Sequence, residues 1–142
     1  MDPKQAIARL NAQFVYRPDP EMIGPWKIMR PEGGFLRGDC EDYALTLAFE
    51  LAGRSRLRFW WHLLTLRSVI WATRSARRGV PHAALWHRAE GLSLKGRWAD
   101  NITGEWRERT PHTRLIPIPA PLVALFMLLG ALGRHWRAPF TS

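Results

Sequence analysis

The sequence contains one cysteine, and it stands among carboxylates. The stretch GDCEDYALTLAFELAG, residues 38–53, places Cys40 between Asp39 and Glu41, with Asp42 next. A free cysteine used for packing behaves as a small hydrophobe and suits apolar neighbours better. At the start of a helix, the positive end of the helix dipole favours the thiolate, although adjacent carboxylates oppose it. Cys40 is therefore a candidate nucleophile.

Two later segments supply a candidate base and a candidate orienting acid. VPHAALWHR and LSLKGRWAD predict two strands around a turn at Gly91. In a hairpin centred on that glycine, His82 lies opposite Asp100. Opposed residues of an antiparallel pair have Cβ atoms about 4.5 to 5.5 Å apart, so the carboxylate can accept a hydrogen bond from the imidazole. The other pairs on this face are Ala84 with Trp98 and Trp86 with Gly96.

His87 is the competing histidine on the same strand. It lies five positions after His82 and faces the other side of a regular strand. We therefore expect His82 to serve the site. Cys40, His82 and Asp100 then form a nucleophile, a base and an orienter. The structural alternatives are a packing cysteine, an ordinary strand histidine and a turn at the Asp-Asn pair.

The helix that carries the cysteine is the clearest predicted element. Asp39 caps it, and Gly53 can end it. Apolar residues cover nearly all of its sides, which indicates a central, buried helix. A shorter helix begins after Asp2 and Pro3, and residues 17–38, with four prolines and four glycines, predict a long loop.

The remaining elements follow from residues 56 to 133. Residues 56–66 predict a basic amphipathic helix, and the run Val69, Ile70 and Trp71 predicts a strand, with the division near Arg67. The segment 115–133 is apolar. Its last proline, Pro121, leaves a helix of about 13 residues, some 20 Å long, which is short of the ~30 Å hydrocarbon core of a bilayer. We expect a packed C-terminal helix without a membrane span, a membrane or partner contact being the alternative.

In order and spacing, the motifs GDCEDYALTLAFELAG, HAALWH and WADN resemble the transglutaminase-like cysteine peptidases of bacteria and their phages. The upstream PWKIMRPEGG is similar to the Trp, then Pro-Glu, that precede the cysteine motif in that family. The resemblance covers about residues 20 to 105. It implies an α+β, papain-like domain over residues 1–142, in which the central helix packs on an antiparallel sheet.

The resemblance also implies roles for single residues. Cys40 is the nucleophile, His82 the base and Asp100 the orienter of a thiol-dependent amide hydrolase that forms a thioester acyl-enzyme. Trp26 matches a tryptophan that helps to stabilise the oxyanion. Some periplasmic members bind calcium through the acids beside the cysteine, here Asp39 and Glu41. No cofactor is required otherwise. The substrate is a polypeptide or, in the alternative of an amidase, peptidoglycan.

The composition bears on three other questions: nucleic-acid binding, location and a structural role. The 21 basic and 12 acidic residues give a net charge of +9, and eight tryptophans accompany the arginines. Arginine and aromatic surfaces suit nucleic acid, but no binding motif accompanies them, so we expect no specific nucleic-acid partner. Residues 1–14 lack the pattern of a secretory signal, so we expect a cytoplasmic or phage-virion protein. A non-catalytic phage structural or assembly protein that contacts other virion proteins remains the rival.

Overall fold

A computed structural model of the chain describes residues 2–17, 26–74, 81–88 and 97–137, with side chains of the last helix described to Leu132. The fold is α+β, as expected from the sequence. The helices are α1 (Pro3–Gln13), α2 (Cys40–Leu51), α3 (Arg56–Leu64) and α4 (Ala120–Arg137). The strands are β1 (Phe14–Tyr16), β2 (Leu36–Gly38), β3 (Ser68–Arg74), β4 (Pro81–His87), β5 (Arg97–Ala99) and β6 (Thr113–Ile118).

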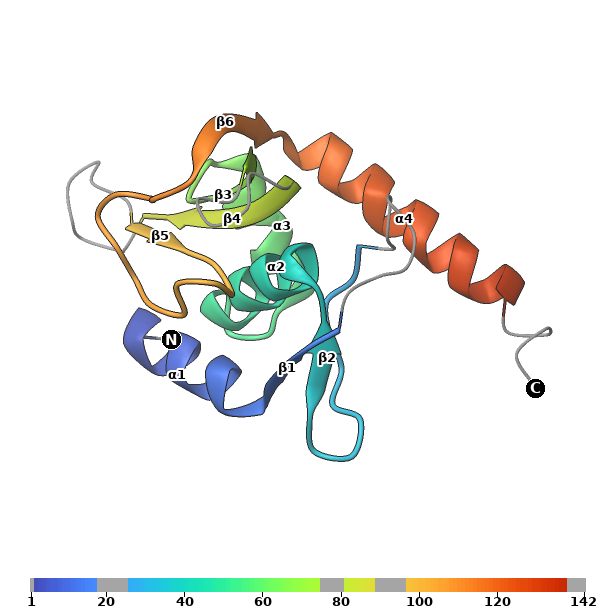
Figure 1. Ribbon diagram of the computed structural model, residues 1–142. Coiled ribbons are helices and arrows are strands. Elements are labelled where there is room, and N and C mark those ends of the chain that lie inside the picture. The colour runs from blue at the N-terminus through green and yellow to red at the C-terminus, as the bar shows by residue number, and fades with distance from the viewer. Residues whose placement is uncertain (1, 18–25, 75–80, 89–96, 138–142) are drawn as a thin grey trace.

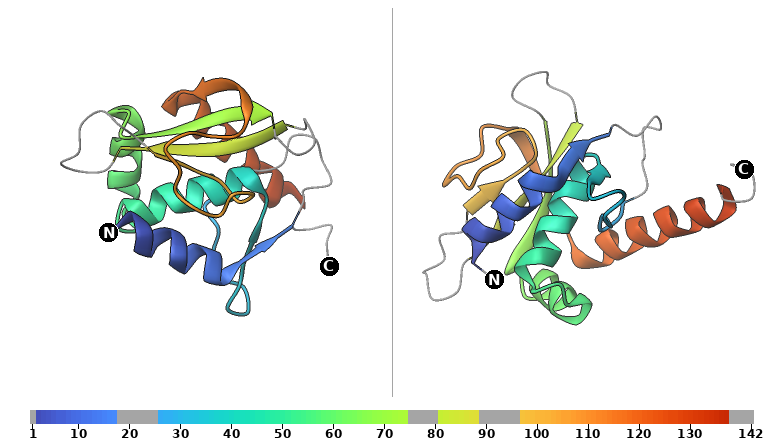
Figure 2. Two further views of the ribbon diagram at one scale, coloured as in Figure 1. Left: turned by 60° about the vertical axis from the view of Figure 1, so that its left-hand side comes forward. Right: turned by 90° about the horizontal axis from the view of Figure 1, so that it is seen from below.

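The helix α2 lies at the centre of the molecule, between α1 and a four-stranded antiparallel sheet of order β5-β4-β3-β6 (Figure 1). Its apolar residues are inaccessible to solvent on several sides, as the prediction of a buried helix requires. Those with no exposed surface are Tyr43, Ala44, Leu45, Leu47 and Ala48. The short parallel pair β1-β2 lies at one end of α2 (Figure 2).

Local hydrogen bonds begin α2 at Cys40. Asp39 is the N-cap: its Oδ1 accepts from the backbone N–H of Asp42 at 3.2 Å, and Asp42 Oδ2 accepts from the N–H of Asp39 at 3.4 Å. This capping box satisfies two otherwise unpaired donors. Gly53 has φ of 68° just after the helix, where a residue without Cβ is least strained. Both predicted ends of the helix are confirmed.

The segment 26–30 is tied along the side of α2. The backbone N–H of Lys27 donates to Asp42 Oδ1 at 3.0 Å, and that of Met29 donates to Thr46 Oγ1 at 2.8 Å. Asp42 and Thr46 are four residues apart and therefore share one face of the helix. Gly38 passes so close that a Cβ there would lie 2.7 Å from Asp42 Oδ2. The packing leaves room only for glycine.

The predicted elements near the sheet are largely confirmed, but the hairpin register is wrong by two residues. Trp86 pairs with Trp98, whereas the prediction paired Ala84 with Trp98 and Trp86 with Gly96. The predicted turn at Gly91 lies outside the described residues. Residues of one strand pair in register with each other, so a single change of register moves every pair by the same two positions. A shift of two leaves each side chain on its original face.

Two C-terminal elements differ from the prediction. The strand β6 was not expected from the sequence; it pairs with β3 at the sheet edge and places Pro117 opposite Trp71. An edge strand tolerates a proline because its outer side pairs with no strand, so the missing backbone N–H breaks no hydrogen bond of the sheet. The helix α4 has 18 residues and begins before Pro121, which fits the first turn.

The expectation that the C-terminal helix is packed holds for one side of α4 only. Val123 is buried, and Phe126 and Met127 pack against the core. Five leucines on the helix are exposed, namely Leu122, Leu125, Leu128, Leu129 and Leu132. The helix extends away from the body of the protein in Figure 1. Among the described residues, no helix is both long enough and apolar enough to cross a membrane.

Candidate functional site

His82 and Asp100 meet in the interior beside the sheet. His82 lies near the start of β4, and Asp100 follows β5 directly. Nε2 of His82 is 3.3 Å from Oδ1 of Asp100, and the two side chains are 4% and 2% exposed. With the observed register the two residues are diagonal neighbours instead of opposed ones. Diagonal side chains on one face remain within reach of each other, so the predicted pair forms despite the wrong register.

Asp100 is held firmly as a carboxylate. Its Oδ1 accepts from the backbone N–H groups of Ile102 and Thr103, at 2.8 and 3.0 Å. Burial alone would raise its pKa, but the nearby imidazole of His82, the Thr103 N–H and the imidazole of His112 outweigh that effect and lower the pKa to about 2. Nε2 of His82 lies at ion-pair distance from the same Oδ1 but has no aligned hydrogen-bond partner among the described residues.

His112 is a site residue that the sequence analysis missed. Its Nε2 lies 2.9 Å from Oδ2 of Asp100, and its side chain is 1% exposed. Its ring meets that of His82 edge to face, with centroids 4.6 Å apart. Nothing in the segment TPHTRL distinguishes this histidine from a surface residue. Only the return of the chain toward β6 brings it to Asp100.

His82, Asp100 and His112 form a donor set suited to a divalent metal. One potential ligand atom from each lies within 4.8 Å of the other two, and all three residues are buried. Two imidazoles and one carboxylate are ligands that zinc and related ions accept. In this structure Asp100 lies within hydrogen-bond distance of Nε2 of His112 and at ion-pair distance from Nε2 of His82. An ion pair between the acid and an imidazole is therefore the alternative to a bound ion.

Cys40 is the first residue of α2 and is half-buried. Burial, followed by the charge of Glu41 and then that of Asp39, raises the pKa of its thiol well above the ordinary range, while a hydrogen bond with the Ala83 backbone opposes the rise. That contact places the thiol against β4 at the residue next to His82. A direct contact between the sulfur and the imidazole stays a prediction.

A second observation connects the first turn of α2 with the acid of the pair. Tyr43 stands three residues after Cys40, on the same side of the helix. Burial and then the charge of Asp100 raise the pKa of the Tyr43 hydroxyl. The start of α2, the start of β4 and the end of β5 therefore converge on one region.

The acids beside the cysteine are not paired with arginines among the described residues. Burial, followed by the hydrogen bond and charge of Asp39, raises the pKa of Glu41 to about 8. Burial and Asp39 likewise raise the pKa of Asp42 to about 7, although Lys27 partly offsets this. Carboxylates this close favour either a shared proton or a bound cation.

His87 has other neighbours, as the alternation of the strand predicts. Its Nδ1 is 2.8 Å from Oγ of Ser68, and its ring lies near His62 and Trp106. Burial, followed by the charges of His62 and Arg67, lowers its pKa to about 4. A neutral histidine engaged in this way does not compete with His82 for the site.

Trp26 lies near the start of α2 because the next residue, Lys27, is bonded to Asp42. The residue is 9% exposed, and its ring packs on Phe126 of α4, with centroids 4.9 Å apart. The oxyanion role expected for this tryptophan stays a prediction.

Comparison of the chain with models of known protein families and with curated proteins finds no match.

Proposed function

We propose that this protein is a thiol-dependent amide hydrolase with a papain-like, transglutaminase-like core, in which Cys40, His82 and Asp100 act as nucleophile, base and orienter. The observation that carries the proposal is the buried 3.3 Å approach of His82 to Asp100, in a histidine whose following residue contacts the cysteine. A cysteine at a helix start, beside a histidine that an acid orients, is the arrangement that thiol hydrolases require.

The raised pKa of the thiol bears on the order of steps. Cys40 is protonated at rest, so attack on the amide carbonyl carbon transfers the thiol proton to His82 as the carbon–sulfur bond forms. His82 then gives that proton to the leaving amine as the carbon–nitrogen bond breaks, which leaves a thioester. Water attacks the thioester, again through His82, and releases a carboxylic acid and the free thiol. Backbone N–H groups at the start of α2 and Trp26 would stabilise the oxyanion.

Calcium at Asp39 and Glu41 remains part of the proposal as an auxiliary ion. The hydrogen-bond contact between the two carboxylates supports it, because a cation would replace the proton that they otherwise share. Two carboxylates are far fewer than the ~6 to 8 oxygens of a complete calcium shell. A chelator should lower the melting temperature if the ion is bound, and calcium should restore it; no response would exclude calcium and leave the triad in place.

A non-catalytic assembly protein is the second candidate. The same raised thiol pKa favours it, since a protonated, half-buried cysteine is inert unless a base assists. A peptidoglycan amidase would use the same residues on a different amide. The substrate therefore distinguishes a peptidase, which cleaves polypeptide, from an amidase, which cleaves peptidoglycan. The reactivity of the thiol distinguishes both enzymes from the assembly protein.

The deciding experiment measures alkylation of Cys40 by a fluorescent iodoacetamide at neutral pH. The native chain should react faster than His82→Ala, because the imidazole accepts the thiol proton, while His87→Gln should match the native rate. Equal rates for all three chains would refute His82 as the base. Turnover of a mixed peptide library and of peptidoglycan follows, with Cys40→Ala as the inactive control; absence of turnover on both would favour the assembly protein.

A further inference from the structure

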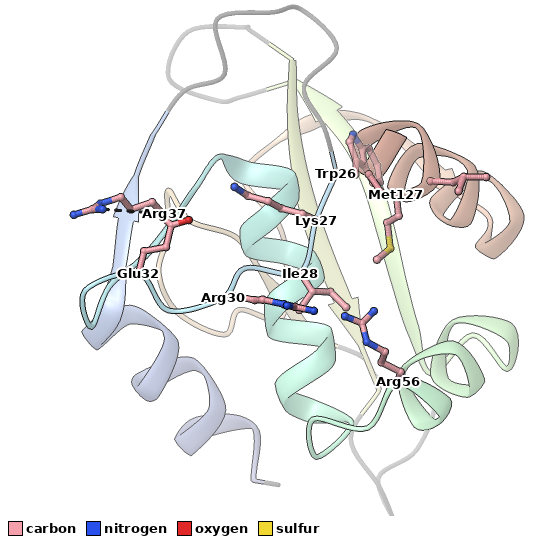
Figure 3. A pocket seen from close by; sticks show the side chains of 10 residues that line it. Trp26, Lys27, Ile28, Arg30, Glu32, Arg37, Arg56 and Met127 are labelled. Atoms are coloured by element: carbon pink, nitrogen blue, oxygen red, sulfur yellow. Dashed lines mark ion pairs between the residues drawn. The ribbon is translucent and has the colours of Figure 1, made fainter. Parts of the chain in front are cut away.

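A cavity of about 590 Å³ lies apart from the Cys-His-Asp cluster, between the segment 26–30, the start of α3 and α4. Figure 3 shows its lining. Trp26, Ile28 and Met127 form an apolar wall, and none of the three proposed triad residues lines the space. The volume falls in the range of ligand pockets, about 300 to 1,000 Å³.

The rest of the lining is strongly basic. Lys27, Arg30, Arg37 and Arg56 contribute positive charge, and Glu32 is the acid among the described lining residues. Glu32 pairs with Arg37, with Oε2 and Nη1 3.9 Å apart. Lys27 interacts with Asp42. No ion pair to a described acid is found for Arg30 or Arg56, so their charges remain available.

The two arginines stand where this cavity adjoins a second one. A smaller cavity of about 300 Å³ shares Ile28, Arg30 and Arg56 with the first. Figure 3 shows the guanidinium groups of Arg30 and Arg56 reaching toward the same space beside Ile28, one from the segment 26–30 and one from the start of α3. We call the two adjoining cavities together the basic groove; Arg30 and Arg56 line both of them. Glu50 of α2 also lines the smaller cavity, where it is paired with Arg54 at 2.9 Å.

We propose that the basic groove binds an acidic polypeptide segment. Guanidinium groups match carboxylates in charge and in planar geometry, so Arg30 and Arg56 would hold one or two Asp or Glu side chains. The apolar wall suits hydrophobic side chains beside those acids. Stacking a base needs a free aromatic face. The two aromatic rings among the described lining residues, Trp26 and Phe49, each already contact a neighbouring ring, Phe126 and Phe59, so single-stranded nucleic acid fits less well.

One lining residue of the groove is bonded to the helical turn that carries the cysteine. Lys27 donates its backbone N–H to Asp42, two residues after Cys40. If the proposed function holds, the groove selects substrates that carry acidic residues near the cleaved amide; that extension rests on the proposed function, whereas binding itself does not. A binding assay without turnover therefore tests the groove separately.

The probe is a fluorescein-labelled decapeptide of alternating Glu and Leu, titrated into the full chain carrying Cys40→Ala and read by anisotropy. Its controls are the same peptide with Gln in place of Glu, and a labelled deca-thymidine. We expect the Glu peptide to bind at least about tenfold more tightly than the Gln peptide, as complementary charge predicts. Equal affinity for the two peptides, or tighter binding of deca-thymidine, would overturn the proposal.

Charge reversals locate the binding surface. Arg30→Glu and Arg56→Glu should each weaken binding of the Glu peptide about tenfold. The matched control is Arg9→Glu, an exposed arginine of α1 outside the groove, which should change the affinity less than about twofold. Should a reversal lower the melting temperature, Arg30→Gln and Arg56→Gln replace it. If charge reversal at Arg9 weakened binding of the Glu peptide as much as reversal at Arg30 or Arg56, the binding would depend on overall charge, and the proposal that the groove binds the peptide would be refuted.

Discussion

His87 should make the stability of this protein depend on pH in a defined window. Its ring is buried, with Nδ1 2.8 Å from Ser68 Oγ, and its pKa falls from 6.5 to about 4 in the folded chain. The folded state therefore binds this proton more weakly than the unfolded state does. The stabilisation is fully present above pH 6.5 and is lost as the pH falls toward 4.

The magnitude follows from the two pKa values. Each pKa unit corresponds to about 1.4 kcal/mol, so the difference between 6.5 and about 4 amounts to about 3 to 4 kcal/mol of unfolding free energy, of which about 3 kcal/mol is lost by pH 4, where the folded histidine begins to titrate. Glu41 and Asp42 produce the opposite slope, because their raised pKa values favour the folded state at low pH. Their contribution cancels when the native chain is compared with a variant that lacks only the histidine.

The assay is urea unfolding of the native chain and of His87→Gln between pH 4 and pH 7. The native chain should lose about 3 kcal/mol relative to the variant on going from pH 7 to pH 4. A difference that stays constant across this range would refute a buried, neutral His87. The rate of Cys40 alkylation should be the same in both chains, since His87 contacts Ser68 and not the proposed site.

The remaining predictions concern the surroundings of the cysteine. Gly38→Ala should destabilise the protein by about 1 to 3 kcal/mol in urea unfolding, because the new Cβ would lie 2.7 Å from a carboxylate oxygen and a methionine sulfur. His112→Ala leaves a buried oxygen of Asp100 without its partner and should cost about 1 to 3 kcal/mol; no loss would show that the 2.9 Å contact is unimportant. Glu41→Gln should lower the pKa of Cys40, seen as faster alkylation at pH 9, where Glu41 with its pKa of about 8 is ionised, because its charge is the main cause of the rise after burial; an unchanged rate at that pH would contradict that order.

Several features follow from local sequence alone. The start of α2 is determined by Asp39 and Asp42, which exchange hydrogen bonds within one turn, so no distant residue is needed to place Cys40. The separation of His82 from His87 follows equally from the alternation of a strand. Such features depend on residues a few positions apart, whose geometry the backbone conformation dictates.

Other features depend on residues that are distant along the chain. The register of β4 and β5, the contact of His112 with Asp100 and the exposed leucines of α4 were not predicted. Periodicity cannot determine where a turn is centred, nor how a chain returns over a sheet.

The raised pKa of Cys40 shows the same division between local and tertiary causes. The position of Cys40 at a helix start and its acidic neighbours could be read from the sequence. Its burial, which is the largest cause of the raised pKa, could not. Desolvation depends on which elements cover a group, and only the packed structure decides that.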